Sequence, residues 1–118
     1  MQNIDGMLYR LSKSKFRGSF HLNTKMKNYV YDKGFEVVRG HAFDFVRERL
    51  SSANPKNDGK QTPMRQVHPV FIAQHACACC CRGCLEKWYH IPKDRDLTSD
   101  EVDAIVELLM EWIRRECY

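Results

Sequence analysis

The stretch that decides the fold is LTSDEVDAIVELLMEWIRREC, residues 97–117. Thr98 and Glu101 form the S/T-x-x-E pattern of a capping box, which marks the start of a helix. Acidic residues follow in the first turn and basic residues in the last, as the helix dipole favours. The sequence therefore predicts a helix from about residue 99 to about residue 116. Its buried stripe is expected at Val102, Ile105, Val106, Leu109 and Ile113, which recur at helical spacing.

Two further helices are predicted upstream of this one. TKMKNYVYDKG, residues 24–34, begins with a threonine that could cap a helix and ends at Gly34, a residue typical of helix ends. VVRGHAFDFVRERL, residues 37–50, places Val38, Ala42 and Phe45 on one face. Gly40 lies inside this segment and costs about 1 kcal/mol of helix stability, but the periodicity still favours a helix.

The centre of the chain holds a loop and two short helices. Residues 51–67 contain two prolines and no apolar periodicity, which predicts one long ordered loop. PVFIAQHA, residues 69–76, and CRGCLEKWYHI, residues 81–91, each suit a short helix. Alternating runs typical of strands are missing from the sequence. We therefore expect an all-α fold, a compact single domain (1–118) of about five helices, with residues 1–15 as a loosely ordered tail.

Composition narrows the class of protein. The chain has 118 residues, 43% of them hydrophobic, which is enough for one buried core. No apolar run approaches the ~20 residues that a membrane helix needs. The first residues lack the apolar core of a secretory signal, so we expect a cytoplasmic protein with no membrane contact.

Charge is unevenly distributed along the chain. Lysine and arginine outnumber aspartate and glutamate 13 to 6 over residues 1–66, whereas residues 67–118 hold 6 basic and 9 acidic residues. A basic half can attract phosphates, so we expect an anionic partner such as nucleic acid or a phosphate-bearing ligand. The alternative is a solvated surface that happens to be basic.

Five of the six cysteines lie between residues 77 and 84. In a protein without a secretory signal, such clustering is typical of metal or redox chemistry rather than of disulfides. The two-residue gap between Cys81 and Cys84 lets both thiolates reach one metal ion, and four Cys and His ligands suit zinc. The alternatives are a weaker match to an iron–sulfur cluster and plain packing of small buried residues. The predicted metal ligands are Cys80, Cys81, Cys84, His75 and His90.

Two other groups of polar residues are candidates for function. The loop NDGKQTPMRQVHP, residues 57–69, could present Lys60 and Arg65 to an anion, and Arg82 is a third candidate for anion binding. For acid–base catalysis the candidates are His68 on the same loop and the pair His41 and Asp44, which lie three residues apart on a predicted helix. The alternatives are a solvated connector and histidines that only pack.

Four linked motifs run along the chain: HAFDFVRERL (41–50), NDGKQTPMR (57–65), HPVFIAQHA (68–76) and CCRGCLEKW (80–88). Together they resemble the motifs of the bacterial family known as domain of unknown function 4186, from about residue 16 to about residue 113. The C-C-R-G-C motif of that family matches Cys80, Cys81 and Cys84, whereas Tyr89 departs from its pattern and displaces His90 by one position. The resemblance implies a small bacterial protein and no particular activity.

Three hypotheses for function follow from these patterns. The first is a helical protein with a zinc site and a basic face for nucleic acid. The second is an enzyme whose pocket is formed by the 57–69 loop, His75 and the cysteine cluster. The third is a metal-free helical module that binds other proteins. The sequence indicates neither a substrate nor an oligomeric state.

Overall fold

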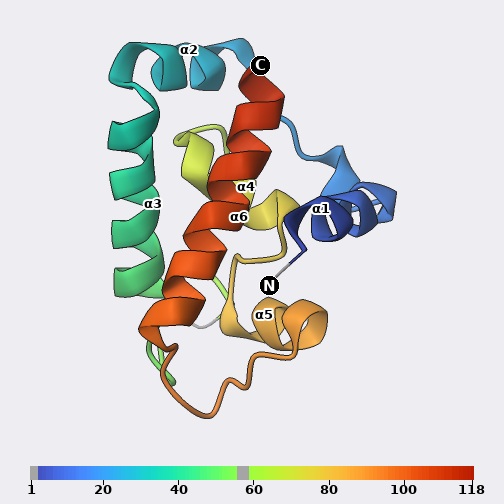
Figure 1. Ribbon diagram of the computed structural model, residues 1–118, viewed down its shortest axis with the longest axis vertical. Coiled ribbons are helices and arrows are strands. Elements are labelled where there is room, and N and C mark those ends of the chain that lie inside the picture. The colour runs from blue at the N-terminus through green and yellow to red at the C-terminus, as the bar shows by residue number, and fades with distance from the viewer. Residues whose placement is uncertain (1–2, 56–58) are drawn as a thin grey trace.

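Six α-helices and one short 3-10 helix form the regular structure of the computed structural model, which describes residues 3–55 and 59–118 (Figure 1). No strand occurs within these residues, so the all-α prediction is confirmed, with one helix more than expected. None of the helices in this part of the chain is long and apolar enough to cross a membrane. The elements are α1 (Ile4–Lys13), the 3-10 helix η1 (Arg17–Ser19), α2 (Thr24–Lys33), α3 (Phe35–Arg49), α4 (Pro69–Ala76), α5 (Arg82–Tyr89) and α6 (Ser99–Cys117).

Helix α6 is the central element of the fold. It contacts α1, α2, α3 and α4, and α3 is its most extensive neighbour (Figure 1). The predicted capping box is present: the Glu101 backbone N–H donates to Thr98 Oγ1 over 3.1 Å, and the Thr98 N–H donates to Glu101 Oε1 over 2.9 Å. The whole predicted stripe is buried, together with Leu108 and Met110.

Helices α2 and α3 follow the predicted ranges closely and meet at a sharp corner. Gly34 has a φ of +89°, a conformation that L side chains rarely adopt, and it both ends α2 and starts α3. The cap of α2 differs from the expectation. Asn23, rather than Thr24, accepts a hydrogen bond from the Met26 N–H through its side chain over 2.9 Å.

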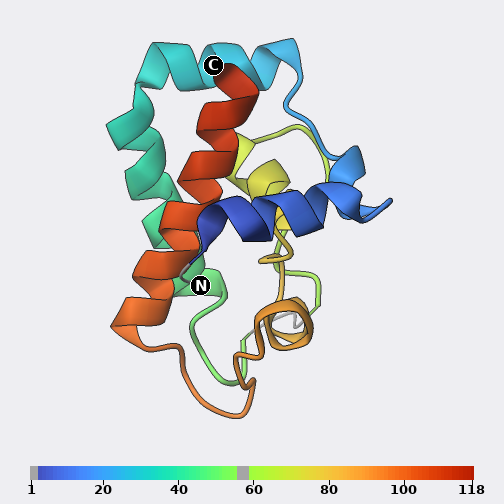
Figure 2. The same cartoon turned by 45° about the vertical axis from the view of Figure 1, so that its right-hand side comes forward.

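Helix α1 occupies most of the segment that was expected to be a loose tail. Met7, Leu8 and Leu11 are buried, and they hold α1 against the core beside α6 (Figure 2). After α1 the chain turns tightly into η1. A Cβ atom at Gly18 would lie 2.6 Å from the Ser12 carbonyl oxygen, so only glycine fits this turn. The turn places the neighbouring residue, Arg17, against the middle of the molecule.

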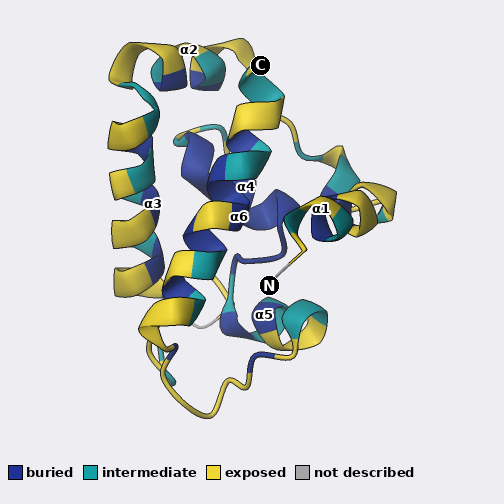
Figure 3. Ribbon diagram, in the orientation of Figure 1, coloured by how far each residue is buried: buried dark blue, intermediate teal, exposed yellow. Residues whose placement is uncertain are grey.

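Every residue of α4 is buried, and the cysteine segment follows directly from its end (Figure 3). Helix α5 then starts after Cys81 and ends at Tyr89, and its C-cap His90 has a left-handed φ of 58°. That end comes two residues before the predicted helix 81–91 finishes. Helix α5 buries Arg82 and Leu85, and Arg82 donates hydrogen bonds to backbone carbonyls of two neighbouring loops.

Candidate metal centre

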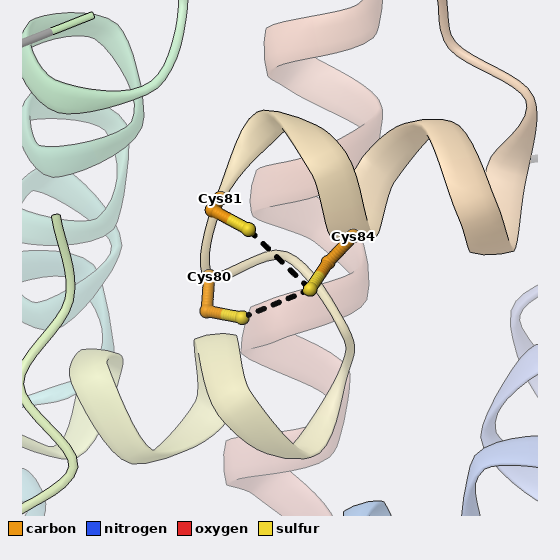
Figure 4. A group of neighbouring side chains, drawn as sticks. All are labelled: Cys80, Cys81 and Cys84. Atoms are coloured by element: carbon orange, nitrogen blue, oxygen red, sulfur yellow. Dashed lines mark hydrogen bonds between the residues drawn. The ribbon is translucent and has the colours of Figure 1, made fainter. Parts of the chain in front are cut away.

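Three cysteine sulfurs converge at the start of α5 (Figure 4). Cys84 Sγ lies 3.5 Å from Cys80 Sγ and 3.4 Å from Cys81 Sγ. The three sulfurs all lie within 4.8 Å of one another. A tetrahedral zinc ion with Zn–S bonds of about 2.3 Å sets its sulfur ligands ~3.8 Å apart. The cluster is therefore of a size that closes around one metal ion with small side-chain movements.

The backbone around α5 explains why these three sulfurs meet. Cys81 is the N-cap of α5 in an extended conformation, and Cys84 lies on the first turn of the helix. Cys80 precedes the helix, and its carbonyl oxygen accepts a hydrogen bond from Thr62 Oγ1 over 2.9 Å. In Figure 4 the three side chains point toward one another, and their sulfurs converge between the start of α5 and the segment before it. The site thus has one residue before the helix, one at its cap and one inside it.

Arg17 brings a positive charge to the cluster from a distant part of the chain. Its guanidinium donates to Cys84 Sγ over 3.1 Å and approaches Cys80 Sγ at 3.6 Å. It also donates to the carbonyl oxygen of His75 over 2.8 Å, which fixes its position. The side chain is nearly buried, at 9% exposure. Hydrogen bonds from a cation stabilise thiolate over thiol, so Arg17 prepares the sulfurs to bind a metal ion.

The pKa values of the three thiols diverge within the cluster. A hydrogen bond from Cys84 lowers the pKa of Cys80 to about 7 against the cost of burial, and Arg17 lowers it further. The same hydrogen bond and burial raise the pKa of Cys84. Burial also raises the pKa of Cys81. Cys80 is therefore the most acidic thiol of the metal-free cluster and is partly ionised near neutral pH.

The two preceding cysteines have a different role. Cys77 and Cys79 are completely buried in the hydrophobic core. Burial raises the pKa of both thiols, so they remain protonated and act as small apolar side chains. For these two residues the packing interpretation is the correct one.

Neither of the predicted histidine ligands joins the three sulfurs. Among the described residues, the group of side chains close enough to share a metal consists of cysteines alone. His75 instead stacks on Phe20, with ring centroids 5.4 Å apart, and its Nε2 donates to the Thr62 carbonyl oxygen over 2.9 Å. His90 is exposed at the far end of α5 from Cys81. His75 therefore supports the loop that covers Cys80, and His90 lies a whole helix away.

Arg82, a predicted anion-binding residue, is directed at backbone carbonyls rather than at solvent. Its side chain is only 1% exposed. Its two terminal nitrogens donate to five backbone carbonyls, because the side chain reaches two loops at once. Three belong to Leu50, Ser51 and Ser52, where α3 ends and the long loop starts, and two belong to Pro92 and Arg95 after α5. Arg82 ties α5 to both loops.

The predicted anion-binding loop is described only in part. Asn57 and Asp58, at its start, lie outside the described residues. Lys60 and Arg65 are exposed, in agreement with a role at the surface. Gln61 and Thr62 between them are buried, and Thr62 contacts both Cys80 and His75. The loop therefore packs against the cysteine segment while its basic side chains face solvent.

The sequence suggested that His41 pairs with Asp44, but in the structure His41 lies beside His68. Asp44 is exposed and lies 3.9 Å from Arg47, whereas His41 Nδ1 lies 3.1 Å from His68 Nε2. His68 also caps α4, because its Nδ1 accepts from the Val70 N–H over 3.0 Å. That bond leaves the ring proton on Nε2, so His68 donates to His41. Burial, and then His41, lower the pKa of His68 to about 4, so His68 is neutral at pH 7.

Arg17 is the functional residue that the sequence analysis missed. It lies 63 positions before Cys80 and belongs to no motif that points to a thiol site. The single signal near it is Gly18, which marks a tight turn but not its contacts. Only the packing of η1 against α4 brings its guanidinium to the sulfurs.

Comparison with known protein families gives a match over most of the chain. The model of the family described as Domain of unknown function (DUF4186) covers residues 5–114, which includes α1 and all three clustered cysteines. The expected resemblance therefore extends further toward the N-terminus than residue 16. No solved structure matches this chain.

Proposed function

The chain belongs to the DUF4186 family, and we propose that it binds one zinc ion through Cys80, Cys81 and Cys84. The observation that carries this proposal is the convergence of three sulfurs beside a buried arginine. Thiolates are soft ligands that suit zinc, and three of them recur in its protein sites.

Charge supports a divalent ion in this place. Three thiolates around a divalent ion leave a formal charge of −1, and the guanidinium of Arg17 neutralises it. Without a metal ion, three adjacent thiolates would repel one another. A bound cation removes that repulsion, so metal binding and full deprotonation of the cluster go together.

The test is the metal content of protein that has been purified without any chelator. We expect native mass spectrometry and elemental analysis to find about one zinc per chain. Cys84→Ser removes the sulfur that contacts both others and should abolish binding. Cys117→Ser is the matched control, because Cys117 lies at the last turn of α6, and this variant should keep the metal. A wild-type chain with no bound metal would contradict the proposal.

A nucleic-acid or phosphate partner stays a prediction, supported by the exposed side chains of Lys60 and Arg65. If phosphate groups bind here, Arg65→Ala should weaken binding to a short duplex and reduce the salt slope by about one contact. Lys87→Ala is the control, because Lys87 is exposed on α5, away from this loop in sequence. Equal affinities of the wild type and Arg65→Ala across a salt titration would show that the loop does not contact phosphate and only connects two helices.

A further inference from the structure

We infer that the metal ion keeps one coordination position open for a small anion from solution. This inference rests on the proposed function, since it concerns the same three sulfurs. It goes beyond that function, because a site with an open position can bind and polarise a ligand, whereas a closed site only supports the fold.

The described residues supply fewer ligands than a zinc ion takes. Zinc in proteins takes four ligands, and the described residues supply three atoms close enough to share an ion. The Nε2–H bond of His75 to the Thr62 carbonyl leaves Nδ1 unprotonated, but neither ring nitrogen lies close enough to the three sulfurs to share an ion with them. The neighbouring thiols of Cys77 and Cys79 are buried in the core rather than turned toward the cluster. The fourth ligand therefore comes from outside this set.

Two of the three cysteines keep part of their surface exposed. Cys80 is 8% exposed, while Cys81 and Cys84 are half-buried. The cluster therefore lies near the border of the protein, and we expect a small molecule to reach an ion held by the three sulfurs without unfolding α5.

Charge selects the class of ligand. An ion held by three thiolates alone is formally negative and would repel a second anion. Arg17 donates to Cys84 and lies beside Cys80, so the metal, its thiolates and this guanidinium together are neutral. Because Arg17 is nearly buried, its charge is poorly screened by solvent. Arg17 therefore offsets the repulsion and lets the metal accept a small monoanionic donor beside the guanidinium, the class that includes hydroxide, carboxylates and thiolates.

The experiment replaces zinc with Co²⁺, whose visible absorption reports the ligands around it. Azide serves as the anionic probe and imidazole as the neutral one. In the wild type, azide should change the cobalt spectrum with a saturable, one-site dependence. Arg17→Gln should weaken azide binding by about tenfold or more through the lost charge and leave imidazole binding nearly unchanged. Arg17→Lys keeps the charge and should retain most of the azide affinity.

The outcomes separate this inference from the proposed function. Failure of the wild type to bind Co²⁺ or zinc would overturn the proposed function itself. A cobalt spectrum that shows sulfur ligands but responds to neither probe would overturn the open position and leave the metal site standing. Equal losses of azide and imidazole affinity in Arg17→Gln would overturn the anion preference. If Arg17→Gln does not fold, the wild type and Arg17→Lys still decide whether the position is open and prefers azide.

Discussion

Cys77 and Cys79 lie within seven residues of Cys84, yet the two groups of cysteines differ in almost every physical respect. The first two are completely buried in the core, and their thiols remain protonated. The cluster of Cys80, Cys81 and Cys84 borders solvent and touches a buried cation. Cysteine in a dense run therefore has no single role, and the surroundings of each sulfur decide between packing and chemistry.

The end of α4 separates the two groups. Ala78 adopts a left-handed conformation with a φ of 56°, a place where helices usually have glycine. The Cys79 N–H donates to the Gln74 carbonyl over 2.8 Å, and the Ala78 N–H donates to that of His75 over 3.3 Å. This pair of bonds is a Schellman motif. It turns the chain so that Cys77 and Cys79 stay inside while Cys80 emerges toward α5.

The largest effect is expected where α5 is anchored. Arg82 lies between the clustered cysteines in sequence, and Arg82→Ala removes the donor to five backbone carbonyls. The change should lower the free energy of unfolding by at least about 3 kcal/mol. Urea unfolding measures this change. Lys87→Ala, an exposed change on the same helix, should stay within about 0.5 kcal/mol. Equal stabilities of the two variants would show that the Arg82 contacts do not hold α5.

A pair of serine variants tests the contrast between the two groups directly. Cys77→Ser places a hydroxyl in the core and should cost about 1–3 kcal/mol, while metal content is unchanged. Cys81→Ser should lose the metal, yet change the stability of the chelator-treated protein by less than about 0.5 kcal/mol. Urea unfolding in the presence of chelator measures the stability of each variant, and elemental analysis without chelator measures its metal content. Loss of metal in Cys77→Ser with no loss of stability would show that Cys77 is a metal ligand rather than a packing residue.

The smallest effect is a shift in a titration. In metal-free protein, alkylation of Cys80 by iodoacetamide should have its midpoint near pH 7, because the pKa of this thiol is about 7, while Cys79 stays unmodified. The folded pKa lies below the usual value of 9.0, so this ionisation stabilises the fold above pH 9 and the contribution is lost as pH falls through 7. Cys84→Ala should move the midpoint toward 9, since Cys84 is the main cause. Peptide mass spectrometry identifies the alkylated site.

Much of the fold could be predicted from sequence because its signals are local. The capping box of α6, the glycine at the end of α2 and the start of α4 at Pro69 all involve neighbours in the chain. Helix α1 was missed although Met7, Leu8 and Leu11 carry a helical spacing. The amphipathic pattern there is short, and α1 is stable only because its apolar face packs against the core.

The site could be predicted only where its ligands are close in sequence. Cys80, Cys81 and Cys84 were found, because a two-residue gap and a neighbouring cysteine are visible in the chain. The contact of Arg17 with sulfur and the burial of Arg82 depend on tertiary packing, and so does the bond that holds His75 to Thr62. No spacing rule distinguishes an arginine that binds anions from one that binds carbonyls.

The three clustered cysteines lie within five consecutive positions, and this has a consequence for folding. Under the proposed function, ligands so close together need little loop closure, so the newly made or unfolded chain should also bind zinc before the helices pack. Metal then stabilises the native state only by the difference between its two affinities, to which the distant Arg17 contributes. Zinc should therefore raise the melting temperature modestly, and its early capture would order the start of α5 before the core forms.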